Sequence, residues 1–229
     1  MTLRTLVSVL AFALPLAAPL TSQAQEADMP PTIIGHIEGG KVYVSPTGTF
    51  KIEIPVLPEL GGRITDTDYV VTFQDDYTTH CSIACFGMDA TLRWEEDTRG
   101  RKDFLTYFFA DAVMGDFQNR FPGATIESAR YRPSLQGGGM FAFTLLPGGT
   151  MFANRVMLAA DEKPPVAKRG NLLFVKNQHV FVISIELAEK VLDRSTWNKT
   201  PEEENEILTK RLVDIVQKMV FTPPAEKAK

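Results

Sequence analysis

Histidine and cysteine, the side chains that most often carry catalysis and metal binding, are scarce in this chain. Its 229 residues include three histidines (His36, His80 and His179) and two cysteines. A catalytic nucleophile needs a neighbouring base and a group that orients that base, so few such arrangements are available. The G-x-S-x-G, H-E-x-x-H and phosphate-binding glycine motifs are missing. We therefore expect a protein that binds rather than an enzyme, with no cofactor.

The chain also lacks an excess of positive charge. Lysine and arginine total 24 against 28 aspartates and glutamates, which gives a formal net charge of −4. Charges of both signs are interspersed, without the basic stripe that is typical of proteins that bind nucleic acid or anionic membranes. Both classes of partner are therefore disfavoured. After the first 24 residues, no apolar run is long enough to span a membrane.

The longest apolar run lies near the start of the chain. It extends from Leu6 to Leu20, follows the positively charged Arg4 and contains Pro15, and the small residues Ser22 and Ala24 come after it. This order is typical of a secretory signal peptide, cleaved here after Ala24. A retained membrane anchor is the alternative, but a helix that spans a membrane needs about 20 apolar residues. The sequence therefore predicts a periplasmic or secreted protein.

Composition divides the chain into four parts. We expect a signal peptide at 1–24, a flexible lead-in at 25–40, a single α+β domain at 41–222 and a loose tail at 223–229. The lead-in begins with polar residues, and the tail begins with two prolines. A single domain is expected because a chain of this length can bury one large core.

Alternation of apolar and polar residues marks the strands. Phe50, Ile52 and Ile54 alternate with charged residues, which is the period of a half-buried strand. We predict strands at 41–44, 50–54, 69–73, 81–87, 125–131, 140–146, 171–175 and 180–185, the last two forming a hairpin of central strands. We also expect a charged turn at 93–101, a hairpin partner for 140–146 at 151–158, and a loop at 161–170.

Two segments have the apolar period of a helix. The first, 103–121, carries a stripe of phenylalanines that we expect to pack in the core rather than to line a ligand pocket. The second begins at Pro201, with Thr200 as N-cap and Glu203 completing a capping box. The order strands, helix, strands, helix has no βαβ alternation. It therefore predicts an α+β fold in which an antiparallel β-sheet is flanked by two main α-helices.

Three segments resemble the PsbP/Mog1-like fold superfamily. The segment Val44–Pro55 is similar to the S-P-x-G-F start of these domains, Leu172–Ile185 to their central strand pair, and Trp197 with Leu212–Phe221 to their closing helix. Met219 and Val220 depart from the family pattern, which has a small residue before the final phenylalanine. The resemblance implies an antiparallel sheet flanked by helices and a non-enzymatic binding or assembly role. The family has no shared catalytic residues to carry over.

The two cysteines, Cys81 and Cys85, lie four residues apart in a predicted strand. In an exported protein a disulfide is the first hypothesis. Residues four apart in a regular strand are about 13 Å apart, beyond the limit of about 7 Å for a bridge. Either the segment is not a regular strand or both cysteines are buried thiols, and we expect buried thiols.

A metal or redox site is the alternative function. His80, Cys81, Cys85 and Met88 together are soft ligands of the kind that hold Cu(I). On a strand, however, the two cysteines share one face while His80 and Met88 point to the other. We therefore expect no metal site here. The sequence favours an exported, non-enzymatic binding or accessory protein whose partner is an unknown protein or a small apolar ligand.

Overall fold

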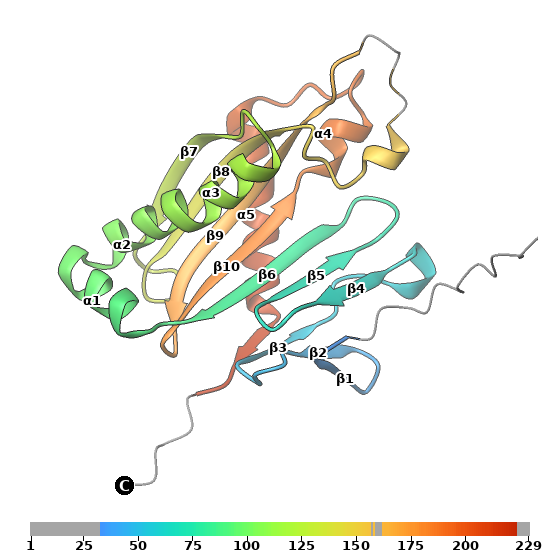
Figure 1. The fold of residues 1–229 in the computed structure, drawn as a ribbon. Helices are drawn as coiled ribbons and strands as arrows, with labels where there is room; N and C mark the ends of the chain where they lie inside the picture. Colours follow the sequence, from blue (N-terminus) through green and yellow to red (C-terminus); the bar gives the residue numbers. More distant parts are fainter. Residues whose placement is uncertain (1–32, 157, 159–161, 224–229) are drawn as a thin grey trace, which may run out of the picture. The chain divides into compact units, whose positions relative to one another are not determined.

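The computed structural model describes residues 33–156, 158 and 162–223, which form two antiparallel sheets packed with helices (Figure 1). The larger sheet has the strand order β4-β5-β6-β10-β9-β8-β7 and the smaller has the order β1-β2-β3-β11. The strands are β1 (His36–Glu38), β2 (Val42–Val44), β3 (Phe50–Glu53), β4 (Arg63–Asp66), β5 (Val70–Gln74), β6 (His80–Gly87), β7 (Thr125–Arg132), β8 (Gly139–Pro147), β9 (Val166–Lys176), β10 (His179–Glu186) and β11 (Met219–Phe221). The predicted α+β class is confirmed.

The helices fall into three groups along the chain. They are α1 (Ala90–Arg99), α2 (Arg101–Phe108), the π-helical segment η2 (Phe109–Val113) and α3 (Met114–Arg120), then α4 (Ala188–Leu192), then α5 (Pro201–Gln217), with short 3-10 turns η1 (Pro58–Leu60) and η3 (Ala153–Arg155). Among the described residues, no helix is both long and apolar enough to cross a membrane.

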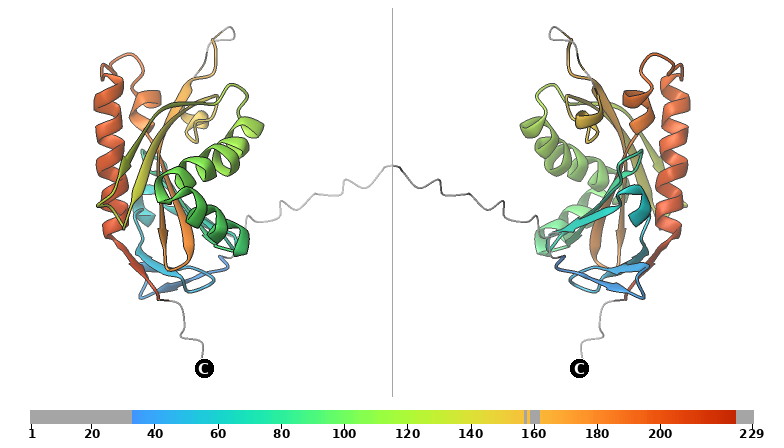
Figure 2. Two further views of the ribbon diagram at one scale, coloured as in Figure 1. Left: turned by 90° about the vertical axis from the view of Figure 1, so that its left-hand side faces the viewer. Right: turned by 90° about the vertical axis from the view of Figure 1, so that its right-hand side faces the viewer.

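Different elements cover the two faces of the larger sheet. Figure 2 shows α2 and α3 on one face and α5 on the other. The predicted phenylalanine stripe packs in the core on the first face, where Phe104, Phe108, Phe109 and Phe117 are buried. On the second face, α5 and the smaller sheet enclose a second core that includes Tyr43. Burial of the aliphatic and aromatic side chains in these two cores stabilises the domain.

The start of α5 confirms the predicted cap. The Thr200 hydroxyl accepts a hydrogen bond from the Glu203 amide, and the Glu203 carboxylate accepts one from the Thr200 amide. Pro201 occupies the first turn, where its missing amide hydrogen costs nothing. The cap fixes the point at which α5 begins, and therefore the position of the buried charges that follow it.

Three of the predicted connections are wrong. The charged turn at 93–101 is largely the helix α1, which buries no residue and so has no apolar period to detect. The hairpin partner at 151–158 does not form, because β8 pairs with β7 and β9 while η3 occupies Ala153–Arg155. The loop at 161–170 is strand from Val166 onward. The prolines and lysines of this segment suggested a loop, but Lys168 and the adjacent Arg169 are buried in ion pairs.

Among the described residues, the first element is β1, which lies inside the segment predicted as a flexible lead-in. β1 pairs with β2 from His36 opposite Val44 to Glu38 opposite Val42. The predicted signal peptide at 1–24 and nearly all of the predicted tail lie outside the described residues.

Candidate functional site

A cleft of about 720 Å³ opens between the smaller sheet and the segment that holds η1 and β4. Its volume falls within the range of cavities that bind small organic ligands, about 300–1,000 Å³. Most of the side chains that line it are apolar, and four of them are isoleucines. The lining residues are Ile33, Ile37, Gly40, Lys41, Glu53, Ile54, Val56, Leu57, Pro58, Glu59, Gly62 and Ile64.

One carboxylate joins the walls of the cleft. Asp66, at the end of β4, accepts hydrogen bonds from the backbone amides of Ile34 and Gly35, each at 2.8 Å, and from the Tyr43 hydroxyl at 2.7 Å. Gly35 is required at this junction, because a Cβ there would lie 2.5 Å from the carbonyl oxygen of Val44. Ile34 and Gly35, just before β1, are therefore held firmly against β2 and β4.

The same contacts set the charge of the junction. Partial burial raises the pKa of Asp66, but the amides of Gly35 and Ile34 and the Tyr43 hydroxyl outweigh it and hold that pKa below its usual value of 3.8. Burial, followed by the contact with Asp66, raises the pKa of the Tyr43 phenol. Asp66 is therefore ionised and Tyr43 neutral at neutral pH. The stability that Asp66 contributes is present above pH 3.8 and is lost as the pH falls through its lowered pKa.

The cleft has the chemistry of a binding site. Lys41, Glu53 and Glu59 are exposed residues in its lining and can hydrogen bond to a polar end of a ligand. Among the lining residues, all of which the structure describes, there is no serine, cysteine or histidine to act as a nucleophile or base. The cleft can therefore exclude water from an apolar group while its charged residues contact a polar end.

The sequence did not point to this cleft. Its walls come from two segments, 33–41 and 53–64, and the first of these falls mostly in the predicted lead-in. Three isoleucines, Ile33, Ile34 and Ile37, precede the predicted domain start. Isoleucine is uncommon in flexible polar segments, so these residues were an available signal of order.

The structure places the four soft ligands on opposite sides of the larger sheet. Cys81 and Cys85 are free thiols in the core that faces α5 and the smaller sheet. Met88 belongs to the core under α2 and α3. His80 is buried, and the charge of Arg169 lowers its pKa. In the part of the chain that the structure describes, no cluster of three or more metal-binding His, Cys, Asp or Glu side chains occurs.

Both thiols are expected to be inert in the folded protein. Burial raises the pKa of Cys81 to about 12. Burial also raises the pKa of Cys85, although the Thr49 hydroxyl at 3.4 Å from its sulfur lowers it in part. The thiolate is the reactive form, so titration with Ellman's reagent at pH 8 should detect no fast thiol in the native protein and two in guanidinium chloride.

The single variants Cys81→Ala and Cys85→Ala show which cysteine gives each of the two reactions with Ellman's reagent. Cys85 should be the first to react when the protein is partly destabilised, because Cys81 is fully buried while Cys85 is 7% exposed. A native thiol that reacts within seconds, or a stoichiometric metal in the purified protein, would instead support the metal or redox alternative.

A row of buried polar side chains crosses the larger sheet below α3. Arg169 on β9 lies opposite Glu186 on β10, with 3.7 Å between the guanidinium and the carboxylate. Glu186 also accepts hydrogen bonds from the Thr150 hydroxyl and the Met151 amide. Burial raises the pKa of Glu186, although these donors and Arg169 oppose it. Both carboxylate oxygens are occupied, so Glu186 holds the segment after β8 in place.

His80 lies in the same polar region. Burial, and then the charge of Arg169, lower its pKa to about 3, so its ring is neutral at physiological pH. Its Nδ1 atom has no hydrogen-bond partner among the described residues. Groups with a strongly shifted pKa often mark functional sites. Here, however, the side chains of His80, Arg169 and Glu186 are buried away from solvent.

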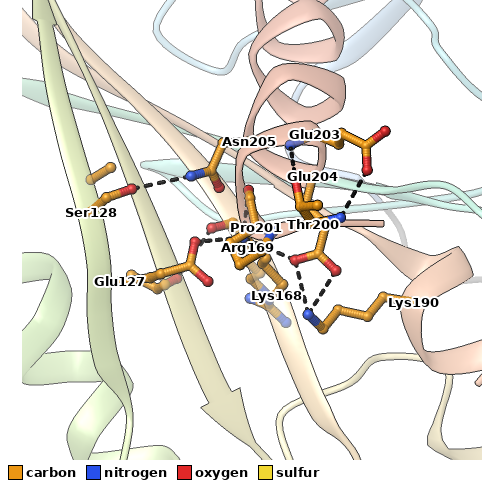
Figure 3. Close-up of polar contacts among 12 residues, drawn as sticks. Glu127, Ser128, Lys168, Arg169, Lys190, Thr200, Pro201, Glu203, Glu204 and Asn205 are labelled. Atoms are coloured by element: carbon orange, nitrogen blue, oxygen red, sulfur yellow. Dashed lines mark hydrogen bonds and ion pairs between the residues drawn. The ribbon is translucent and has the colours of Figure 1, made fainter. Parts of the chain in front are cut away.

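A second buried ionic network joins α5 to the larger sheet (Figure 3). Lys168 of β9 is fully buried and contacts Glu204 of α5 at 3.0 Å and Glu127 of β7. Glu204 also accepts hydrogen bonds from Lys190, at 2.7 and 2.9 Å, and from the Trp197 indole at 2.7 Å. Every charge in the network has a partner, which is the condition for burying it.

The comparisons with known proteins concern the fold. No family model matches the sequence, and no curated protein matches it. Among solved structures, the chain is similar to the Ran-binding protein Mog1p of Saccharomyces cerevisiae, with 12% identity over 82% of this chain and 98% of that chain and a TM-score of 0.49. It is also similar to PsbP (CyanoP) of Synechocystis, with 12% identity over 85% of this chain and 100% of that chain and a TM-score of 0.44.

A third structure, from Bacteroides thetaiotaomicron, has 11% identity over 82% of this chain and 50% of that chain, with a TM-score of 0.39. The structure shows the antiparallel sheets and helices that the resemblance implied, while membership of the PsbP/Mog1-like superfamily stays a prediction from the three resembling segments. At these identities the likeness concerns the fold alone. Function has to be argued from the side chains of this protein.

Proposed function

We propose that this chain is an exported, non-enzymatic binding protein whose cleft between the smaller sheet and β4 takes a small apolar ligand. The observation that carries the proposal is the cleft itself, which has an apolar lining and a volume of about 720 Å³. Ile37 and Leu57 remain 42% and 57% exposed within it. Apolar side chains gathered in a concave site are the usual feature of a ligand pocket.

The Asp66 junction supports the proposal because it makes the cleft a preformed site. Ile34 and Gly35 are tied to β4 through Asp66, so the wall that carries Ile33 and Ile37 does not need to be ordered by the ligand. A preformed site avoids the entropic cost of ordering on binding. Export is proposed from the leader pattern, and it would place the ligand outside the cytoplasm.

The test is a fluorescence titration with the apolar probe anilinonaphthalene sulfonate. We expect Ile37→Glu and Leu57→Glu each to weaken binding of the probe about tenfold or more, because they place a charge in the apolar cleft. Ile126→Glu is the matched control, since Ile126 is 43% exposed, close to the 42% of Ile37, but does not line the cleft.

Urea unfolding of each variant checks that the fold is intact, because the probe also binds partly unfolded protein. Equal effects of Ile126→Glu and Ile37→Glu, or binding that is unchanged by both cleft variants, would rule the cleft out as the site.

A further inference from the structure

β7 is a free edge of the larger sheet. It pairs with β8 on one side, and among the described residues no strand pairs with its other side. The view on the left of Figure 2 shows this edge between α5 and the helices α2 and α3. Most of its residues are exposed. A free edge presents unpaired backbone amides and carbonyls, which is the feature that accepts an added strand.

The two halves of β7 differ. The pairing with β8 is irregular between Ile126 and Ser128, and such a bulge protects an edge against other strands. From Ser128 to Arg132 the pairing is continuous, and this half contains no proline. Figure 3 shows the Asn205 amide of α5 donating to the Ser128 hydroxyl, at 3.2 Å. The regular half is therefore held in position by α5 and open along its edge.

The open half of β7 carries positively charged side chains and lies beside a hollow. Arg130 and Arg132 alternate with Tyr131, so they lie on one face, and Arg130 is opposite Phe141, which packs in the core under α5. Both arginines are exposed, and neither forms an ion pair with any described residue. A hollow of about 240 Å³ adjoins them, lined by Arg132, Ser134, Leu135, Phe141, Thr209 and Val213.

We propose that the Ser128–Arg132 edge of β7 binds an extended segment of a partner protein as an added strand. The segment carries an acidic side chain that pairs with Arg130 and, two positions away on the same face, an apolar side chain that enters the hollow beside Arg132. Backbone hydrogen bonds supply affinity in such complexes, and the alternate side chains supply specificity. The surface is separate from the apolar cleft, so the two sites can be occupied together.

A second copy of this chain is a poorer occupant. In a symmetric antiparallel pairing of two Ser128–Arg132 edges, the central residue Arg130 would lie opposite itself. Like charges directly opposite each other destabilise a sheet. The unpaired arginines thus favour an acidic segment over self-association.

The test measures binding of the fluorescently labelled peptide Thr-Val-Glu-Val-Leu-Val-Thr to the full chain by fluorescence anisotropy. We expect saturable binding, and we expect Arg130→Glu to weaken it about tenfold. A second peptide, with lysine in place of glutamate, should bind the Arg130→Glu variant with the affinity that is lost by the first. The peptide should protect the amides of 128–132 from hydrogen exchange. Lys102→Glu, an exposed charge change on α2, is the matched control and should leave binding unchanged.

Four results would overturn the proposal. The first is equal binding of a peptide that is N-methylated at alternate amides, since that peptide cannot add as a strand. The second is protection outside β7, and the third is the absence of saturable binding at millimolar peptide. The fourth is concentration-dependent dimerisation with protection of 128–132 in the protein alone, which would make a second copy the occupant.

Discussion

Replacing Glu204 with alanine is expected to lower the free energy of unfolding by about 3–5 kcal/mol. Glu204 is 2% exposed and meets two lysines and the Trp197 indole. Its removal leaves Lys168 buried with Glu127 as its one remaining carboxylate. Urea unfolding followed by circular dichroism measures the loss. Glu206→Ala, an exposed change two residues along the same helix, should stay within about 0.5 kcal/mol of the parent protein.

The effect of Glu204 should depend on pH in a defined direction. Burial raises the pKa of Glu204, but hydrogen bonds from Lys190, Trp197 and Lys168 outweigh it and hold that pKa below its usual value of 4.5. The carboxylate therefore contributes its full stability above pH 4.5 and loses it as the pH falls through the lowered pKa. The difference between Glu204→Ala and the parent should shrink in acid. A difference that grows in acid would contradict the assigned charge state.

Replacing Glu186 with alanine is expected to cost a similar amount, about 3–5 kcal/mol. The variant leaves the buried Arg169 without its carboxylate, and it removes the acceptor that holds Thr150 and Met151. Hydrogen exchange at 149–152 should rise together with the loss of stability. Arg169 retains a hydrogen bond to the carbonyl oxygen of Gly149, at 3.2 Å, which does not neutralise its charge.

A double-mutant cycle separates the ion pair from simple loss of packing. Arg169→Met and Glu186→Met should each be strongly destabilising, while the double variant should lose less than the sum of the two, because no unpaired charge remains. Additive losses within about 0.5 kcal/mol would show that the two side chains act independently.

Local sequence patterns predicted the elements whose signals are local. The cap of α5 depends on Thr200, Pro201 and Glu203, which are consecutive or nearly so, and the structure reproduces it. The hairpin of β9 and β10 was predicted because both strands are apolar on both faces, and they lie in the centre of the larger sheet. The helix α1 had no such signal, because none of its residues is fully buried and Leu92 packs only partly buried against the core.

Buried charges misled the sequence reasoning for a physical reason. The prolines and lysines of 161–170 led to the prediction of a loop, although Lys168 and Arg169, at the start of β9, are buried. Their partners, Glu204 and Glu186, lie 36 and 17 residues further along the chain, and no local pattern reports such pairings. The cleft also depends on contacts between segments that are distant in the sequence. Its two walls come together through the hydrogen bonds of Asp66 with the amides of Ile34 and Gly35.

The central claim is that the apolar cleft is the ligand site of this protein. Amide chemical shifts of the labelled protein, measured during titration with anilinonaphthalene sulfonate, test it most directly. We expect the largest changes in residues 33–41 and 53–64, which form the walls of the cleft. Changes that concentrate instead in residues 104–117, under the helices of the opposite face, would contradict the assignment.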